Sequence, residues 1–227
     1  MRISIIIPTL NEAEHIESTL MRLEPLRQNG HEVIVVDGGS QDATVNLAKN
    51  RADSVIISAP GRALQFNAGA RQATGDVLWF LHADSQVSKV AAEQLLLALN
   101  NQNNYWGRFD IRLSGKHILL RIVEQLMNLR PRLTGIATGD QGIFVRRDCF
   151  EAIGGFSQIP LMEDIEISRR LKKWSWPCCI HDTIKTSSRR WEEYGILSTI
   201  LLMWRLRLGY AFGVSPEKLA HDYKVGK

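Results

Sequence analysis

The chain has 227 residues, 44% of them hydrophobic, which suits a globular protein of one domain, or of one domain with a small appendage, and excludes a disordered chain. Its net charge of +4 is uneven, because residues 169–227 contain 12 of the 28 basic side chains but only 5 of the 24 acidic ones. Such a basic segment indicates either a solvated helical surface or a face that meets anionic lipid, phosphate or nucleic acid.

The three cysteines are Cys149, Cys178 and Cys179, and two of them are adjacent. An odd number with this spacing is a poor disulfide framework and a poor zinc site. The apolar run at 3–7 is too short for the core of a signal peptide and stops at Pro8. We therefore expect a cytoplasmic protein, with peripheral contact to the inner face of the plasma membrane as a further option.

Strands and helices alternate in the first hundred residues. Short apolar runs rich in β-branched residues predict buried strands at 3–7, 32–36, 54–57 and 77–81. Helical spacing and capping residues predict helices at 11–27, from Ser40 or Asp42 to about 51, and at 63–73 and 88–100. This order predicts an α/β fold with a doubly wound sheet that is mainly parallel in its first half.

The second half of the chain is less regular. An alternating strand is expected at 108–113, a helix at 116–129 that ends before Pro131, a glycine-punctuated loop at 135–142 and a helix at 163–174. The apolar helix at 196–212 is at the lower length limit for crossing a bilayer, and Arg205 and Arg207 interrupt it on different sides, so we expect no membrane span. It either packs in the core or lies on a membrane surface.

Polar residues gather where three of the predicted strands end. These segments are 8–12, 37–40 and 82–85, and in a sheet of this kind ligands bind beyond the carboxyl ends of the strands. The second segment, Asp37-Gly38-Gly39-Ser40, can turn tightly towards a ligand and offers a carboxylate to a base or ribose, or it is an ordinary turn. The sequence contains neither G-x-G-x-x-G nor a P-loop, so dinucleotide oxidoreductases and P-loop enzymes lose support.

His82 and Asp84 follow the fourth strand directly. A carboxylate on a loop beside phosphate oxygens can complete the shell of Mg²⁺ or Mn²⁺, and an imidazole can add a nitrogen, although such a pair also occurs in capped turns. Asp164 opens a predicted helix whose dipole keeps a carboxylate ionised, as a general base requires, or it is ordinary first-turn acidity. Arg62 after Pro60-Gly61 suits an anionic ligand or is a surface arginine.

Six motifs occur together in a known order. They are I-I-I-P-T-L-N-E, V-V-D-G-G-S-x-D-x-T, G-x-x-x-x-x-N-A-G-x-x-x-A-x-G-D, H-A-D, M-E-D and R-R-W. From residue 2 to about 191 the chain resembles the family 2 glycosyltransferases of the GT-A fold, within them a small bacterial subgroup with H-A-D-S and a short apolar C-terminal helix. The resemblance implies a transferase domain at 1–191, with a nucleotide-binding half at 1–100 and an acceptor and catalytic half at 101–191. A helical extension follows at 192–227.

The resemblance also implies a role for each matching residue. Asp164 would deprotonate the acceptor hydroxyl, and Asp84 at the second acid of the family's D-x-D would hold Mn²⁺ or Mg²⁺ together with His82. The nucleotide-sugar donor, usually a uridine one, would be bound by Pro8, Thr9, Asn11, Glu12, Asp37, Gly39, Arg62, Asn67, His82, Ala83 and Asp84. The acceptor or the diphosphate would be contacted by Asp140, Gln141, Glu163, Arg190 and Trp191.

Two departures from the family pattern bear on this reading. His82 replaces the first Asp of D-x-D, which removes a negative charge, and Ser187 stands where the Gln of Q-x-x-R-W would be, which favours a single transfer over processive synthesis. The implied reaction is metal-dependent and inverting, and the acceptor is a hydroxyl compound for which a lipid is one candidate, with membrane contact through 195–213. Nucleic acid is not an expected partner.

Two other functions remain as alternatives. A nucleotidyltransferase would need a glycine-rich loop with a basic residue near the first strand, and the segment at 8–12 has neither. A degenerate transferase that only holds a nucleotide sugar or a lipid is left open by His82 and Ser187.

Overall fold

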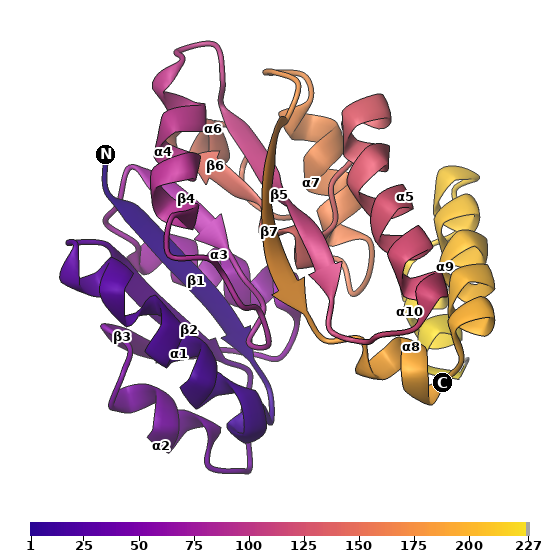
Figure 1. Cartoon of the computed structure of the whole chain (residues 1–227), viewed down its shortest axis with the longest axis horizontal. Helices are drawn as coiled ribbons and strands as arrows, with labels where there is room; N and C mark the ends of the chain where they lie inside the picture. The colour runs from indigo at the N-terminus through magenta and orange to yellow at the C-terminus, as the bar shows by residue number, and fades with distance from the viewer. Residues whose placement is uncertain (226–227) are drawn as a thin grey trace.

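The computed structural model describes residues 1–225 and contains one seven-stranded sheet with helices on both faces (Figure 1). The strands are β1 (Ile3–Thr9), β2 (Glu32–Asp37), β3 (Ser54–Ile57), β4 (Val77–Phe80), β5 (Trp106–Leu113), β6 (Phe144–Arg146) and β7 (Cys178–Thr186). The longer helices are α1 (Ala13–Gln28), α3 (Arg62–Gln72), α4 (Ala91–Asn100), α5 (Ile118–Thr134), α7 (Glu163–Leu171), α9 (Ile196–Ala211) and α10 (Pro216–Val225). The shorter ones are α2 (Thr44–Lys49), η1 (Gly139–Gln141), α6 (Arg147–Ala152) and α8 (Arg189–Glu193).

The strand order is β3-β2-β1-β4-β6-β5-β7. Strands β1 to β4 are parallel to one another where they pair, β6 is antiparallel to both β4 and β5, and β7 is parallel to β5. Every strand except β6 therefore ends at the same edge of the sheet, which we call the rim. The prediction of a doubly wound mixed sheet, mainly parallel in its first half, is confirmed.

Alternation along the strands divides the core between the two faces of the sheet. In β1, Ile3, Ile5 and Ile7 pack with α1 and α4, whereas Ile6 packs on the other face with α3, α6 and α7. All four side chains are fully buried, and each contributes roughly 1.5–3 kcal/mol of hydrophobic free energy. The core thus fixes the strand ends, and with them the loops of the rim.

The predicted end of α5 was wrong. The helix was expected to stop before Pro131, but it continues to Thr134 with Pro131 buried inside it. A proline has no N–H, so the carbonyl of Met127 loses its usual helical partner. The side chain of Gln141 donates to that carbonyl at 3.2 Å, which replaces the missing bond. The sequence also gave no prediction for β6, β7, α6, α8 or α10.

Helix α5 covers a stretch of β5 that β6 is too short to pair with. The side chain of Asn128 accepts from the N–H of Ile111 at 2.8 Å and donates to its carbonyl at 3.1 Å. Glu124 accepts from the N–H of Leu113, and Arg121 donates to the carbonyl of Leu113 at 2.9 Å. These side chains take the place of a neighbouring strand and hold α5 at a fixed height on the sheet.

Replacing Asn128 with leucine is expected to lower the free energy of unfolding by about 2–4 kcal/mol, because the N–H and the carbonyl of Ile111 both lose their partner. Chemical denaturation of the two proteins measures the difference. The control is Gln125→Leu, an exposed position on the same helix. Equal stability of both variants would show that Asn128 does not support the edge of β5.

No helix within residues 1–225 is both long and apolar enough to cross a bilayer, which agrees with the expectation for 196–212. One face of α9 packs through Leu206 against α10 and against Leu161, Met162 and Ile165 at the start of α7. The opposite face is exposed, so α9 is a surface helix with one buried side.

Candidate functional site

The turn after β2 is organised around Asp37, whose side chain is buried. Its carboxylate accepts from the hydroxyl of Thr9 at 3.0 Å and from the backbone N–H groups of Gly39 and Ser40 at 2.9 and 2.7 Å. Burial opposes ionisation, but the hydrogen bonds from Ser40 and its neighbours outweigh it and lower the pKa of Asp37. Asp37 is therefore an ionised carboxylate that fixes the shape of the turn.

The loops after β1 and β2 are joined through side chains from both. Asn11, in a left-handed conformation, donates its N–H to the hydroxyl of Ser40 at 2.8 Å and accepts from the N–H of Gln41 at 2.9 Å. The N–H of Glu12 donates to the hydroxyl of Thr44 at 2.8 Å. The two predicted segments thus form one rigid part of the rim.

Gln65 positions the start of α3 against this unit. Its side-chain amide donates to the carbonyls of Thr9 and Val36, both at 2.8 Å, at the ends of β1 and β2. Arg62 lies one turn earlier on the same helix, so its guanidinium is held above the rim. Sequence reasoning predicted Arg62 but missed Gln65, because a buried glutamine inside a helix carries no recognisable signal.

His82 lies next to the η1 turn. A Cβ atom at Gly139 would be only 2.9 Å from Nε2 of His82, so a glycine is needed for this close approach. Burial and the positive charge of Arg62 lower the pKa of His82, which keeps the imidazole neutral. Its Nε2 is buried and has no hydrogen-bond partner within the described chain. An unpaired neutral nitrogen is a ready ligand or hydrogen-bonding group.

Asp84 bridges the ends of β4 and β7. Its carboxylate accepts a long hydrogen bond of 3.4 Å from the N–H of Ser187. Burial, with the nearby negative charge of Asp84, raises the pKa of Glu12. Glu12 and Asp84 therefore form an acidic pair above the rim, and a cation placed there would relieve their repulsion.

Glu163 and Arg62 form an ion pair at the start of α7. Nε of Arg62 lies 2.7 Å from Oε1 of Glu163, whose side chain is almost fully buried. Oε2 of Glu163 has no hydrogen-bond partner among residues 1–225. Burial raises the pKa of Glu163 to about 7, against the opposing effect of Arg62 and with the added repulsion of Asp164. The pair therefore keeps a guanidinium at the rim that is only partly neutralised at neutral pH.

The raised pKa of Glu163 predicts a pH dependence of stability. The folded protein holds this proton up to about pH 7, whereas the unfolded chain releases it near 4.5, so stability falls as the pH rises through this window. The contribution is roughly 3 kcal/mol or less. Glu163→Gln is expected to remove this fall, as measured by urea denaturation at a series of pH values.

The control for that measurement is Glu166→Gln. Burial opposes its ionisation, but hydrogen bonds from Arg170 and Ser157 lower the pKa of Glu166, so its contribution to stability changes with pH in the opposite sense. Identical pH profiles for the wild type and Glu163→Gln would contradict the account of the buried pair.

Asp164 follows Glu163 but is half-buried and faces the η1 turn. Its carboxylate accepts from the N–H of Gly139 at 3.1 Å and from the N–H of Ile165 at 2.7 Å. Asp140 lies in the same turn, and the charges of both acids act on His82 and Arg62. The fold therefore brings His82 and Asp84, which follow β4, near Asp164 at the start of α7, although Asp84 and Asp164 are 80 residues apart in the sequence.

Arg190 is half-buried on α8 and lies against the last helix. Its guanidinium is 3.8 Å from the centroid of the Tyr223 ring, and its Nε is buried without a hydrogen-bond partner in the described structure. Tyr223 on α10 also lies near Arg62. The C-terminal helix thus reaches the rim beside two cations, and nothing in the spacing of the sequence predicted this.

Three predicted residues are not part of this cluster. Both ends of the Asn67 amide are bonded to the backbone of Phe156, at 2.7 and 2.9 Å. Gln141, the last residue of η1, is fully buried; its side chain donates to the carbonyl of Met127 at 3.2 Å and accepts from the N–H of Thr138 at 3.1 Å. The partly buried ring of Trp191 packs against an apolar cluster with α5 and α9. Their predicted contacts with donor or acceptor stay predictions.

Arg130 is a further cation that the sequence did not reveal. It extends from α5, donates to Ile136 and Thr138 at 3.2 and 2.9 Å, and lies near Asp140 and Asp164. Burial, with the repulsion of Arg207 on α9, lowers the pKa of Arg130 to about 10. Its position depends on how α5 packs against the rest of the protein, and no local sequence pattern predicts that packing.

A divalent cation fits the rim only as a shared ion. In the part of the chain that the structure describes, no three Asp, Glu, His or Cys side chains are grouped so that they could hold a metal by themselves. Asp84 offers one carboxylate and His82 one unpaired nitrogen. Mg²⁺ and Mn²⁺ sites often have this form, with phosphate oxygens and water completing the shell. The residues therefore fit a cation that binds with a diphosphate.

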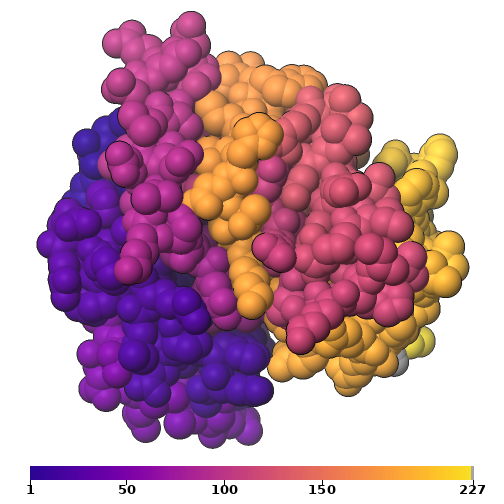
Figure 2. Space-filling model, in the orientation of Figure 1, coloured from indigo at the N-terminus to yellow at the C-terminus, as the bar shows by residue number. Residues whose placement is uncertain are grey.

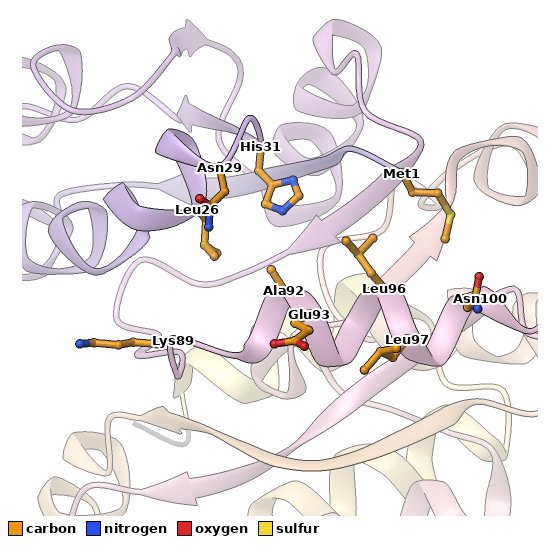
Figure 3. Close-up of a pocket in the computed structure, with 10 residues that line it drawn as sticks. All are labelled: Met1, Leu26, Asn29, His31, Lys89, Ala92, Glu93, Leu96, Leu97 and Asn100. Atoms are coloured by element: carbon orange, nitrogen blue, oxygen red, sulfur yellow. The ribbon is translucent and has the colours of Figure 1, made fainter.

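A hollow of about 520 Å³ lies elsewhere, between the end of α1 and α4 (Figure 3). It is lined among others by Met1 and His31, which come just before β1 and β2, and by Asn100 at the end of α4, so it lies at the edge opposite the rim. None of the predicted site residues lines it. The candidate site is therefore the rim.

Comparison with known proteins decides the family. The sequence profile described as "Glycosyl transferase family 2" matches residues 4–153. The chain belongs to this family. Among solved structures, the mannosyltransferase PcManGT from Pyrobaculum calidifontis, in complex with GDP-Man and Mn²⁺, superposes with a TM-score of 0.69 at 18% identity, over 98% of this chain and 68% of the other.

Other similar proteins add to the comparison. Glucosyl-3-phosphoglycerate synthase from Mycobacterium tuberculosis, in complex with Mn²⁺ and UDP-glucose, gives a TM-score of 0.61 at 19% identity over 82% of this chain and 70% of the other. "Probable glycosyltransferase YdaM" of Bacillus subtilis (strain 168) is 27% identical over 99% of this chain and 58% of its own length. "Beta-monoglucosyldiacylglycerol synthase" of Trichormus variabilis is 25% identical over 93% of this chain and 48% of its own length.

These comparisons confirm the predicted family and the GT-A fold. The chain spans about half the length of the curated relatives it matches, 58% and 48% in the two cases. The subgroup with H-A-D-S and the division into halves at 100 and 191 stay predictions.

Proposed function

We propose that this chain transfers a sugar from a nucleotide-sugar donor to a hydroxyl group, in one step and with inversion at the anomeric carbon. The observation that carries the proposal is the convergence of Asp84, His82 and Asp164 at one end of the sheet, on the frame of a family 2 glycosyltransferase. A sugar placed between Asp84 and Asp164 would have a diphosphate site on one side and a carboxylate base on the other.

Asp164 takes the proton in this proposal. Its carboxylate accepts from the backbone N–H groups of Gly139 and Ile165, which hold it in the first turn of α7 facing the η1 turn. As the acceptor oxygen attacks the anomeric carbon, the carboxylate receives the hydroxyl proton, and the bond from that carbon to the diphosphate oxygen breaks. No covalent enzyme intermediate forms, which is why one carboxylate is enough.

The departing diphosphate carries the developing negative charge. Arg62 and Arg190 reach the rim, and each can hold phosphate oxygens with a planar guanidinium. A divalent cation bound by Asp84, with His82, would supply Lewis-acid neutralisation of the same charge. The loops at Asn11 and Asp37, which are fixed by their mutual hydrogen bonds, would hold the nucleoside.

A hydrophobic acceptor is the form of the proposal that we favour. A relative is named for the synthesis of monoglucosyldiacylglycerol, and in this chain α9, which is rich in leucine, packs against the start of α7 where Asp164 lies. A uridine donor is supported by the complex of glucosyl-3-phosphoglycerate synthase with UDP-glucose, whereas PcManGT was solved with GDP-Man, so both donors belong in the test.

The proposal is tested by measuring release of nucleoside diphosphate from UDP-glucose and from GDP-mannose, with diacylglycerol in vesicles as acceptor, in Mn²⁺ and in EDTA. We expect release that depends on acceptor and metal, and a product of inverted configuration by NMR. A retained configuration would contradict the mechanism. Tight nucleotide binding without turnover on any hydroxyl acceptor would favour the alternative of a degenerate binder.

A further inference from the structure

Helix α5 carries a row of exposed apolar side chains on its outer face. These are Ile118, Ile122, Leu126, Leu129 and Leu133, each between 48% and 69% exposed. At 100° per residue they fall within an arc of about 80°. The buried residues of the helix, such as Leu120 and Glu124, lie on the opposite side and face β5. The row is therefore not a by-product of core packing.

Helix α9 carries a matching row. Leu197, Leu201, Trp204 and Leu208, with Phe212 directly after the helix, are between 54% and 86% exposed. They also fall within an arc of about 80°, opposite the buried Thr199 and Leu206. A contiguous row of large exposed apolar side chains marks an interaction surface.

The two helices are neighbours. Leu120, Val123 and Met127 of α5 share one apolar cluster with Ile196 and Ile200 of α9. In Figures 1 and 2, α5 and the segment that contains α9 lie next to each other at one end of the molecule, beyond β7. The two rows thus belong to one end of the protein, which we call the α5–α9 face.

The charges on these helices indicate which partner fits. Five arginines lie in the two helices, three in α5 and two in α9. Arg121 and Arg132 are paired with the carboxylates of Glu124 and Asp110, whereas the side chain of Arg205 is 67% exposed, 3.6 Å from Asp222 of α10. Lys172 lies at the end of α5, where it donates to the carbonyl of Thr134 at 2.9 Å, next to the exposed indole of Trp176. Exposed leucines and indoles, in a segment (169–227) with 12 basic and 5 acidic side chains, match the acyl chains, interface and headgroups of an anionic bilayer.

We propose that the α5–α9 face binds the surface of a membrane that contains anionic phospholipids, with both rows of side chains inserted at the level of the headgroups. The consequence for catalysis rests on the proposed function: α9 packs on the loop before Asp164, and α5 begins at the rim, so docking places the rim beside the bilayer. A lipid hydroxyl could then reach the base without leaving the membrane interface.

The test is sedimentation of the purified chain with vesicles of phosphatidylcholine alone and of phosphatidylcholine mixed with phosphatidylglycerol. The variants are Leu126→Glu on α5 and Leu201→Glu on α9, and the matched control is Leu97→Glu on α4, a leucine of similar exposure (65%) beside the hollow of Figure 3. We expect binding to the mixed vesicles that weakens with salt. Each row variant should lower the partition constant roughly tenfold or more, and the control should bind as the wild type does.

Two outcomes would overturn the inference. One is that the wild type does not sediment with the mixed vesicles, or that both row variants sediment with them as strongly as the wild type does. The other is a wild-type dimer by light scattering that the row variants convert to monomers, because the face would then belong to a second copy of the chain. Titration of UDP without vesicles separates this inference from the proposed function. A chain that binds vesicles but no nucleotide would contradict only the proposed function. A chain that binds nucleotide but no vesicles would contradict only the membrane inference.

Discussion

Replacing Asp164 with asparagine is expected to lower kcat for sugar transfer by roughly 10²–10⁴-fold, because the variant keeps the size of the side chain and one acceptor oxygen for the backbone but cannot take the acceptor proton. The affinity for the nucleotide should stay nearly unchanged, since Asp164 contacts the η1 turn and not the loops of the nucleoside site. Transfer kinetics at saturating donor, together with calorimetric nucleotide titration, measure both quantities.

The matched control is Asp148→Asn. Asp148 lies in the first turn of α6 and accepts from the next backbone N–H at 2.7 Å, the same local bond that Asp164 makes in α7. It lies outside the rim, so its substitution should leave kcat unchanged. If both variants transfer sugar at the wild-type rate, another group is the base, and Asp140 would be the next residue to replace.

Asp84→Asn is expected to reduce kcat/KM for the donor by roughly 10²-fold or more in Mn²⁺, because the loss of a carboxylate removes the main protein ligand of the proposed cation. The dependence of the rate on Mn²⁺ should become weak at the same time. Initial rates over a range of Mn²⁺ concentrations test this.

Asp76→Asn is the control for Asp84, because it lies directly before the strand that Asp84 follows. Its carboxylate accepts from the N–H of Arg2 at 2.7 Å, at the edge of the sheet opposite the rim. A variant at Asp84 that keeps the wild-type response to Mn²⁺ would show that the diphosphate is held by cationic side chains without the metal. His82→Asn distinguishes the contribution of the imidazole, and we expect a smaller loss there than at Asp84.

Local patterns in the sequence were sufficient for the first half of the fold. The strands β1 to β4 are short, apolar and bounded by turn residues, so their positions and shared direction could be predicted. Strand β6 has three residues and no pattern of its own, and β7 begins with two adjacent cysteines and continues without a regular alternation. These strands form because they pair with β5. Such pairing depends on the tertiary structure and not on the local sequence, so the two strands could not be predicted.

The site could be predicted where residues follow a strand directly. Asp37, His82 and Asp84 are set at the rim by the strands before them, and Asp164 by the start of α7. Gln65 could not be predicted, because its importance comes from carbonyls of two distant strands. Asn67 and Gln141 match the family motif or its loops, and their side-chain amides bond to the backbone. A motif alone does not tell whether such an amide contacts the ligand or the protein backbone.

The most direct test of the account is a calorimetric titration of the wild-type chain with UDP and with GDP, each in Mn²⁺ and in EDTA. If the rim is a nucleotide-sugar site completed by a shared cation, one of the two nucleotides binds in Mn²⁺ and its affinity falls strongly in EDTA. Equal affinity in EDTA would contradict the role of Asp84 and His82 as ligands of that cation. No binding of either nucleotide would contradict the central claim that the rim holds a nucleotide-sugar donor.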